Sequence, residues 1–383
     1  MNILVLGAGM YVTGRHGTGN GTILSSLCEL SRNATVTNVT IASRTAFSAS
    51  SVHAAAKNIN EILKTNLSIT HVCINNEGDF ENLFNDKYTA AIVVLPDNLH
   101  YLFTRKLLYK KIPTLVVKPF VSTFEEAKAL IDIQKINGTY GAVEFHKRWD
   151  QTNLKAKKLI DEGKLGDLLY CIVEYSQRIS IPMKTFASWA AESNIFQYLG
   201  VHYVDLFYFI TGFRPIRISS VGTNGILRQK GLDTWDSIHT TIIWHNNIDK
   251  ECIQHISCNW IDPEGTSSLS DQKYTIVGTR GRIDIDQKKR GMELVLENGG
   301  TQELNPYFSE YLPDANGCMR FTGYGFESIK QFITDVNALE QGTINIDNLE
   351  KIRPTFTEAL VSTKIIDAGN TSLSFNGKWI NIK

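Results

Sequence analysis

Hydrophobic and polar positions follow two different patterns along this chain, and the change between them divides it into two parts. Up to residue 146, short apolar runs alternate with segments that have the helical period of about 3.6 residues. The apolar runs predict strands at 2–7, 36–43, 69–74, 90–95, 113–117 and 139–145. The segments between them predict helices near 22–32, 46–64, 78–87, 97–110 and 123–136. Such alternation is typical of a parallel sheet with right-handed crossovers, whose ligands bind beyond the carboxyl ends of the strands.

From residue 167 onward the chain has long alternating runs with few helices between them. These runs predict strands at 168–178, 215–223, 236–245, 251–260, 272–278 and 282–286. Helical periodicity occurs at 150–162, 194–211, 323–340 and 354–369. This pattern favours a mostly antiparallel sheet with one open face, and we expect that face to be a surface for self-association.

The first predicted strand runs into a glycine-rich turn. Gly7 and Gly9 provide the tight bend and the close backbone approach that a pyrophosphate needs. Val12 occupies the third position of the usual glycine fingerprint, and further glycines follow at Gly14, Gly17, Gly19 and Gly21. A P-loop is excluded because no Lys-Ser or Lys-Thr pair follows. We therefore predict an α/β protein with a Rossmann dinucleotide-binding domain over 1–146 and an α+β domain with a large, mostly antiparallel open sheet over 147–383. The alternative for the turn is a mobile surface loop.

The second predicted strand ends on Ser43, Arg44 and Thr45. Where such a domain binds NAD, an acid usually stands here and accepts hydrogen bonds from the ribose. A hydroxyl and a guanidinium suit a 2′-phosphate better, since a guanidinium pairs with phosphate and stacks on adenine. These residues predict NADP as the cofactor, with NAD as the alternative. The other interpretation of Arg44 is an ordinary surface arginine.

Two more strand ends carry candidate residues. Leu95 and Pro96 end the fourth strand, and the helix that follows contains Asn98 and His100. The alternative is that Asp97 or Asn98 is only a cap of that helix. Lys118 ends the fifth predicted strand. Desolvation and cationic neighbours there would lower the pKa of its amine and let it bind a hydroxyl or relay a proton. The expected cofactor contacts are Gly7, Gly9, Met10, Tyr11, Ser43, Arg44, Thr45, Leu95, Pro96, Asn98, His100, Lys118 and Pro119.

The predicted helix over 194–211 carries Tyr198, His202 and Asp205 at helical spacing, with Gly200 between them. A phenol, an imidazole and a carboxylate on one face can pass a proton to or from an alcohol oxygen. The alternative is that the two rings are packing residues and Asp205 is their hydrogen-bonded partner.

Composition limits the kinds of partner. The 383 residues include 39 basic and 39 acidic side chains, which predicts neither nucleic-acid binding nor a basic membrane patch. Six scattered cysteines without a Cys-x-x-Cys pair indicate reduced thiols, and we expect no metal site. The first strand begins at once, and no apolar run approaches the roughly 20 residues of a membrane span. We therefore expect a cytoplasmic protein.

These motifs together resemble the glucose–fructose oxidoreductase / inositol dehydrogenase / MocA family over nearly the whole chain. Besides the N-terminal pattern, the resemblance is carried by Pro96-x-x-x-His100, Lys118-Pro119, the stretches at 145–150 and 160–166, Gly200-Val201-His202-x-x-Asp205 and Ile276-x-Gly278-Thr279-x-Gly281. The resemblance implies hydride transfer between the C4 atom of a nicotinamide and a hydroxyl-bearing carbon. It implies a sugar, polyol or nucleotide sugar as the substrate.

The resemblance also implies roles for individual residues. Lys118 matches the lysine that binds the reacting oxygen and helps to move its proton, and His202 matches a catalytic or substrate-positioning histidine. Lys147 and Arg148 match a basic pair that in relatives contacts cofactor or substrate hydroxyls. The expected substrate contacts are Lys147, Arg148, Trp149 and Asp205. The expected protein is an NADP-dependent oxidoreductase that forms a homodimer or homotetramer through the C-terminal sheet.

Two positions depart from the family pattern. Val117 replaces the glutamate before the lysine, which removes a carboxylate near the cofactor. Tyr198 replaces the aspartate that the family carries four residues before the histidine. Some sugar oxidoreductases of the family use a tyrosine as the acid/base. Either Tyr198 or Lys118 would therefore transfer the proton. Two other functions stay open: a non-catalytic sensor that binds the dinucleotide, and a glycosidase that uses NAD transiently without net redox change.

Overall fold

The computed structural model describes residues 1–14, 21–45 and 47–382 of the chain. Its contacts divide the chain into two compact units, and each unit combines segments that are distant in sequence. The first unit contains Met1–Phe120, Glu125–Trp149 and Tyr307–Ala359. The second contains Val121–Phe124, Asp150–Pro306 and Leu360–Lys383.

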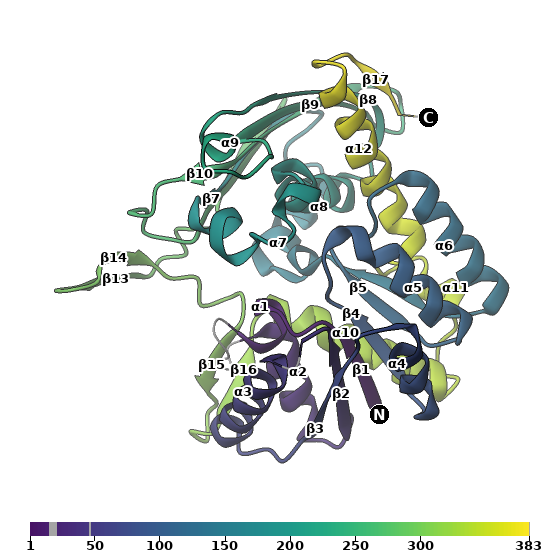
Figure 1. Ribbon diagram of the computed structural model, residues 1–383. Helices are drawn as coiled ribbons and strands as arrows, with labels where there is room; N and C mark the ends of the chain where they lie inside the picture. The colour runs from purple at the N-terminus through teal and green to yellow at the C-terminus, as the bar shows by residue number, and fades with distance from the viewer. Residues whose placement is uncertain (15–20, 46, 383) are drawn as a thin grey trace. The chain divides into compact units, whose positions relative to one another are not determined.

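The first unit is built on a sheet of six parallel strands in the order β3-β2-β1-β4-β5-β6 (Figure 1). Its strands are β1 (Asn2–Leu6), β2 (Asn38–Ser43), β3 (Ser68–Cys73), β4 (Ala90–Val93), β5 (Thr114–Val117) and β6 (Gly141–Glu144). All six predicted strands are confirmed. The strand order reverses between β1 and β4, and in sheets of this kind the carboxyl ends of the strands at that point form the ligand site.

Helices cover both faces of this sheet. They are α1 (Met10–Thr13), α2 (Thr22–Ser31), α3 (Phe47–Leu63), α4 (Glu77–Asn82), α5 (His100–Tyr109) and α6 (Phe124–Asn137), with short turns η2 (Leu83–Asn85) and η3 (Asp97–Leu99). Apolar residues of α2 and α3 share one core with Ile3 and Val5 of β1, while α5 packs against β4 and β5. The predicted helices are confirmed, and α1 is an additional turn of helix directly after the glycine turn.

The segment Tyr307–Ala359 packs with the N-terminal sheet although it is distant in sequence. It contains β15 (Glu310–Pro313), β16 (Met319–Thr322), α10 (Tyr324–Glu340) and α11 (Ile346–Leu349). Ile329 and Phe332 of α10 belong to the same core as Ile3, and the Glu29 carboxylate accepts a hydrogen bond from the Phe321 amide at 3.1 Å. This grouping differs from the predicted division into 1–146 and 147–383. Periodicity predicted the helix over 323–340, but periodicity does not say which sheet a helix packs on.

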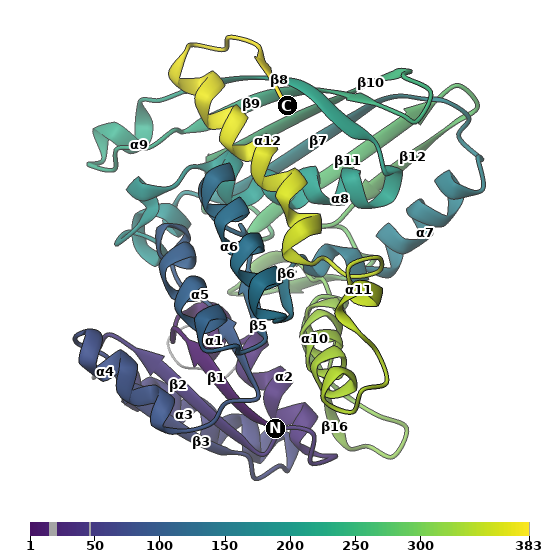
Figure 2. The same ribbon diagram turned by 90° about the vertical axis from the view of Figure 1, so that its right-hand side faces the viewer.

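The second unit is built on a seven-stranded sheet in the order β12-β11-β7-β10-β9-β8-β17 (Figure 2). Its strands are β7 (Leu168–Arg178), β8 (Arg214–Thr223), β9 (Ser237–His245), β10 (Glu251–Asp262), β11 (Ser270–Gly278), β12 (Gly281–Asp286) and β17 (Ile380–Asn381). Only β7 and β10 pair in parallel, and the other neighbours are antiparallel. The predicted α/β class with a mostly antiparallel second sheet is therefore confirmed.

One face of this second sheet is covered and the other is open. The helices of the second unit are α7 (Gln151–Asp161), α8 (Val201–Thr211), α9 (Ile226–Gln229) and the part of α12 (Phe356–Ser374) from residue 360 onward. The Phe207 ring of α8 lies 5.0 Å from the Trp244 ring on β9. On the opposite face, Tyr170, Ile172 and Val221 are 38%, 43% and 50% exposed.

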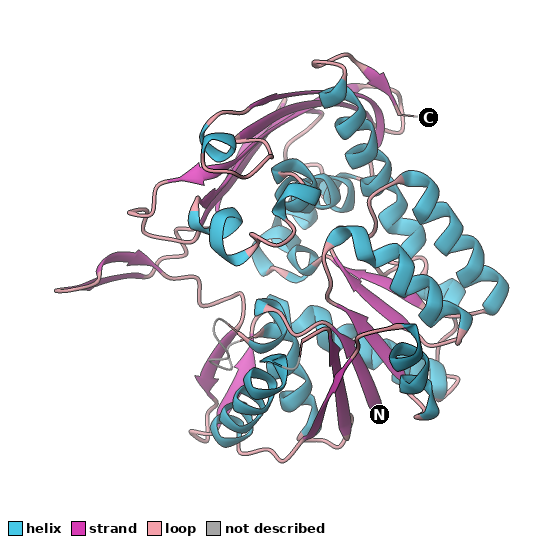
Figure 3. Ribbon diagram, in the orientation of Figure 1, coloured by secondary structure: helices cyan, strands magenta, loops and turns pink. Residues whose placement is uncertain are grey.

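Two features of the second unit were not predicted, a π-helical turn and a separate hairpin. The helix expected over 194–211 begins as a π-helical turn, η7 (Phe196–Gly200), and continues as α8. A separate hairpin of β13 (Glu293–Leu296) and β14 (Gly300–Glu303) extends from the second unit (Figure 3). None of the helices in the described part of the chain is both long and apolar enough to cross a membrane.

Candidate active site

The turn after β1 has the geometry that a dinucleotide site requires. Gly7 has φ of +111°, and its amide donates to the Ala42 carbonyl at 2.8 Å. A Cβ atom at Gly7 would lie 2.1 Å from the Val94 carbonyl oxygen, so only glycine fits. Gly9 is exposed at the start of α1, and no described atom lies within 4 Å of the position of its missing Cβ. Met10 and Tyr11 follow it as the first two residues of α1.

The described residues on the two sides of the extended glycine segment belong to two helices. α1 ends at Thr13, before Gly14, and α2 begins at Thr22, after Gly21. A Cβ atom at Gly21 would lie 2.2 Å from the Val12 carbonyl oxygen, so the two helices approach backbone to backbone. Gly17 and Gly19 lie outside the described residues.

The end of β2 presents one guanidinium to solvent. Arg44 is exposed, and its side chain makes no hydrogen bond or ion pair within the described residues. The Ser43 hydroxyl lies 2.8 Å from Nε2 of His71 on β3, and burial lowers the pKa of His71. The Thr45 hydroxyl lies 2.7 Å from the Ser48 hydroxyl. Arg44 is therefore the group at this strand end that is available to an anion, while Ser43 is already paired with a histidine that sequence reasoning missed.

His100 joins the loops that follow β4 and β5. It is fully buried, with Nε2 at 2.8 Å from the Leu95 carbonyl and Nδ1 at 2.8 Å from the Pro119 carbonyl. Both ring nitrogens thus face protein carbonyls, and the contact of His100 with the cofactor stays a prediction. In the same loop Asn98 is exposed, whereas Leu95 and Pro96 are partly exposed.

Lys118 follows directly after β5, and its peptide bond to Pro119 is cis. The lysine is partly buried, and burial lowers the pKa of its amine to about 8. The nearby charges of Asp97 and Glu144 act in the opposite direction and raise that pKa. An amine with a pKa near 8 can both accept and release a proton close to neutral pH, as proton transfer to a hydroxyl requires.

Glu144 is a second candidate residue in the first unit, and sequence reasoning did not select it. It ends β6 and is 2% exposed. Its carboxylate accepts hydrogen bonds from the Tyr11 hydroxyl at 3.1 Å and the Ser328 hydroxyl at 2.7 Å. Nδ1 of His146 lies 3.1 Å from the same carboxylate. A charged residue at the end of an apolar strand is the same kind of signal that identified Lys118, and it could have identified Glu144.

The predicted substrate contacts of the first unit lie on η4 (His146–Trp149). Lys147 and Arg148 are buried, and Trp149 is partly exposed. The Arg148 guanidinium lies 3.5 Å from the Glu358 carboxylate and 5.8 Å from the centre of the Phe145 ring. The charge of Arg148 is therefore paired within the unit, and of these three residues Trp149 has the most open position.

The predicted proton-transfer residues of the second unit lie on η7 and α8. The Tyr198 ring lies 5.0 Å from the Phe186 ring and 5.4 Å from the Trp189 ring. His202 and Asp205 are buried on α8, three residues apart and hence on one helical face. The structure thus assigns these three residues to the second unit, while Lys118 belongs to the first.

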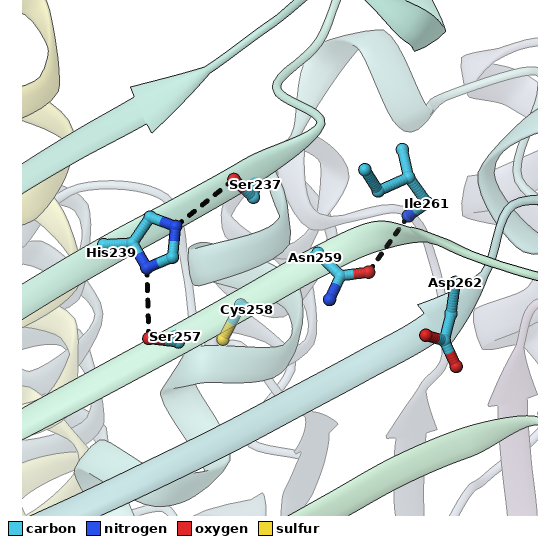
Figure 4. Close-up of a pocket in the computed structure, with 7 residues that line it drawn as sticks. All are labelled: Ser237, His239, Ser257, Cys258, Asn259, Ile261 and Asp262. Atoms are coloured by element: carbon cyan, nitrogen blue, oxygen red, sulfur yellow. Dashed lines mark hydrogen bonds between the residues drawn. The ribbon is translucent and has the colours of Figure 1, made fainter.

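A polar hollow lies on the open face of the second sheet (Figure 4). Its volume is about 380 Å³, and the residues that line it are Ser237, His239, Ser257, Cys258, Asn259, Ile261 and Asp262. Nδ1 of His239 lies 3.0 Å from the Ser257 hydroxyl and Nε2 lies 3.4 Å from the Ser237 hydroxyl. The imidazole is thus held between two hydroxyls, and the hollow contains no predicted site residue.

The reversed strand order, the glycine turn and the desolvated lysine define a dinucleotide-binding protein of the doubly wound type. Two models of one family match the chain. "Oxidoreductase family, NAD-binding Rossmann fold" matches residues 1–145, and "GFO/IDH/MocA C-terminal domain" matches residues 153–284. The chain belongs to this GFO/IDH/MocA oxidoreductase family, as its motifs indicated.

Similar proteins include oxidoreductases and inositol dehydrogenases. An uncharacterized oxidoreductase of Schizosaccharomyces pombe is 33% identical over 265 residues, which are 66% of this chain and 63% of that protein. The NADP(+)-dependent scyllo-inositol 2-dehydrogenase of Bacillus subtilis is 26% identical over 43% of this chain and 45% of its own length. The NAD(+)-dependent enzyme of the same organism is 23% identical over 71% and 76%. The alignments thus span less than two thirds of the length of the Schizosaccharomyces pombe protein and of the NADP(+)-dependent Bacillus subtilis enzyme.

Solved structures share the fold over the full length. The myo-inositol 2-dehydrogenase from Lactobacillus plantarum has a TM-score of 0.70 at 15% identity, with 100% of this chain and 99% of that chain covered. The scyllo-inositol dehydrogenase from Lactobacillus casei, solved with NAD(H) and scyllo-inositol, has a TM-score of 0.67 at 15% identity with the same coverage. Similarity at this level of identity supports the fold alone.

Proposed function

We propose that the protein is an NADP-dependent oxidoreductase that transfers hydride between the nicotinamide and a carbinol or keto carbon of a sugar, polyol or nucleotide sugar. The observation that carries this proposal is Lys118, an amine with a pKa of about 8 directly after a strand of a dinucleotide-binding sheet. The names of the inositol dehydrogenases among its relatives support a polyol-like substrate.

The residues present fit a bound dinucleotide. Gly9 leaves backbone open at the start of α1, and Arg44 is exposed at the end of β2. The cofactor would supply the hydride acceptor or donor at its nicotinamide. Arg44 would bind the 2′-phosphate through charge-assisted hydrogen bonds, while Thr45 and Asn98 line the neighbouring strand ends.

The chain's own residues would manage the substrate oxygen. Lys118 would bind the reacting hydroxyl, Tyr198 or Lys118 would move its proton, and His202 would orient the substrate. Lys147, Arg148, Trp149 and Asp205 are the proposed substrate contacts. Positioning and proton transfer matched to hydride transfer would lower the barrier.

Cofactor choice is tested by Arg44→Ala. Loss of a charge-assisted contact of roughly 1.5–3 kcal/mol raises KM for NADP by about 10–100-fold and leaves KM for NAD nearly unchanged. A parent protein that prefers NAD would contradict the assignment of Ser43 and Arg44 to a 2′-phosphate.

We further propose that the protein forms a homodimer or homotetramer through the open face of its second sheet. Tyr170, Ile172 and Val221 place exposed apolar surface on that face. Sedimentation of the parent and of Ile172→Lys tests this, since a charge in an apolar interface would shift the protein to smaller species. A parent that sediments as a monomer would contradict it.

The reaction itself is tested with a panel of sugars, polyols and nucleotide sugars, each with NADP and with NAD, followed by nicotinamide absorbance. Lys118→Ala should reduce turnover by a factor on the order of 10² or more. Dinucleotide binding without turnover on any substrate would indicate a sensor. Substrate cleavage without net reduction of the cofactor would indicate a glycosidase.

A further inference from the structure

Glu144 lies beside the residue that precedes Lys118. It is the last residue of β6, and it pairs in register with Val117 of β5. Paired residues on neighbouring strands are about 5 Å apart and point their side chains to the same side of the sheet. A carboxylate at position 144 therefore lies next to the place from which a carboxylate at position 117 would extend.

Hydrogen-bond donors from three elements hold the Glu144 carboxylate in the interior of the first unit. The Tyr11 hydroxyl of α1 donates at 3.1 Å, and the Ser328 hydroxyl of α10 donates at 2.7 Å. Nδ1 of His146, on η4, lies 3.2 and 3.1 Å from the two carboxylate oxygens. Contacts from three elements therefore fix the position of this carboxylate.

The charge of Glu144 acts on Lys118 and on the glycine turn. It raises the pKa of Lys118, together with Asp97, against the larger effect of burial. Burial and then Glu144 also raise the pKa of Tyr11. Tyr11 on α1, Lys118 after β5 and His146 on η4 interact with this carboxylate. The charge of Asp97 on η3 acts on Lys118, and the Tyr324 ring of α10 lies 5.8 Å from the His146 ring.

We propose that Glu144 is the carboxylate partner of Lys118 in this chain, and that it replaces from the neighbouring strand the glutamate that the family carries immediately before the lysine. The role of Lys118 in proton transfer rests on the proposed function. Glu144 is a positioning residue: it acts through Lys118, whose protonated form its charge favours, and through Tyr11, which it ties to the end of β6.

Trace acetylation of the cofactor-free protein across a pH series, read by mass spectrometry of the peptide that contains Lys118, measures the titration midpoint of this amine. Glu144→Gln keeps the shape of the side chain and removes its charge, so the midpoint should fall from about 8 by about one pH unit. The control is Asp335→Asn, another buried carboxylate of the first unit, which bonds Tyr140 and Arg353. Asp335→Asn should lower stability but leave the Lys118 midpoint in place.

The relocation itself is tested by moving the charge back. In the double variant Val117→Glu/Glu144→Gln, the midpoint of Lys118 should return toward the parent value. Should that variant not fold, Glu144→Asp decides, because it keeps a carboxylate at 144 and should keep the parent midpoint. An unchanged Lys118 midpoint in Glu144→Gln overturns the proposal. A folded double variant whose midpoint stays as low as that of Glu144→Gln also overturns it. The same holds for a Glu144→Asp variant with that low midpoint.

This labelling experiment uses neither substrate nor cofactor. An inactive parent on the whole sugar panel would remove the proposed function and leave the Lys118–Glu144 measurement standing. An unchanged Lys118 midpoint in an active enzyme would remove only the partnership with Glu144.

Discussion

Replacing Lys118 by methionine removes a desolvated ammonium group and keeps most of the volume of the side chain. In the folded protein, burial lowers the pKa of this amine from 10.5 to about 8, whereas the unfolded chain exposes it to water. The folded protein therefore binds this proton more weakly than the unfolded chain does. The resulting cost to stability is fully present below about pH 8 and disappears as the pH rises from about 8 to 10.5.

The size of the effect follows from the same two values. The difference between 10.5 and about 8, at 1.36 kcal/mol for each pKa unit, is about 3 kcal/mol. The attraction of Asp97 and Glu144 is already contained in the value of about 8, since their charges raise it. We therefore expect Lys118→Met to raise the free energy of unfolding of the first unit by about 3 kcal/mol near pH 7, and by little near pH 10.5.

Urea titrations from about pH 7 to about pH 10, followed by hydrogen exchange of peptides from β4 and β5, report on the first unit alone. The matched control is Lys57→Met, because the Lys57 side chain is 79% exposed and its loss should change stability by less than about 0.5 kcal/mol. A Lys118→Met protein that is no more stable than the parent near pH 7 would refute a desolvation cost at Lys118. A gain in stability that does not shrink as the pH rises would refute it equally.

Two further predictions concern the strand ends. His100→Leu leaves the Leu95 and Pro119 carbonyls without the imidazole between them. Urea unfolding should therefore show a free energy of unfolding that is lower by about 2–4 kcal/mol. An unchanged urea midpoint would contradict the linking role of His100. Gly7→Ala places a Cβ atom 2.1 Å from the Val94 carbonyl oxygen and should cost at least about 2 kcal/mol. The matched control is Gly9→Ala, because Gly9 has φ of −74° and open space at the position of its missing Cβ. This variant should change stability by less than about 0.5 kcal/mol and weaken dinucleotide binding. Equal losses of stability in both variants would contradict the steric role of Gly7.

The sequence predicted the large sheets well because their strands are buried apolar runs between polar segments. The burial of β4 and β5 on both faces illustrates this, and so does the strict alternation along β10. The hairpin of β13 and β14 escaped prediction because each strand has only four residues, and none of them is buried. The division into units escaped prediction because the apolar stripe of α10 fits either sheet equally well as far as periodicity can tell.

Candidate residues that lie directly after strands could be predicted, since their position depends only on where the chain leaves the sheet. Gly7, Arg44 and Lys118 are of this kind. The partner of such a residue is set by strand order and register, which a local pattern does not contain. His71 reaches Ser43 because β3 pairs with β2, and this pairing is not visible in either segment alone.

Glu144 shows what this difference means for judging a departure from a family pattern. Along the chain, Val117 stands where the family carries a carboxylate beside Lys118, and the loss of that carboxylate favours a protein without redox activity. Read across the sheet, position 117 pairs with position 144, where a buried glutamate acts on the charge of Lys118. Electrostatic interaction depends on distance and burial and is indifferent to the strand that carries the charge. A missing motif residue therefore argues against activity only when the residues paired with it on the neighbouring strands cannot supply the same charge. Here Glu144, which pairs with Val117, supplies that charge.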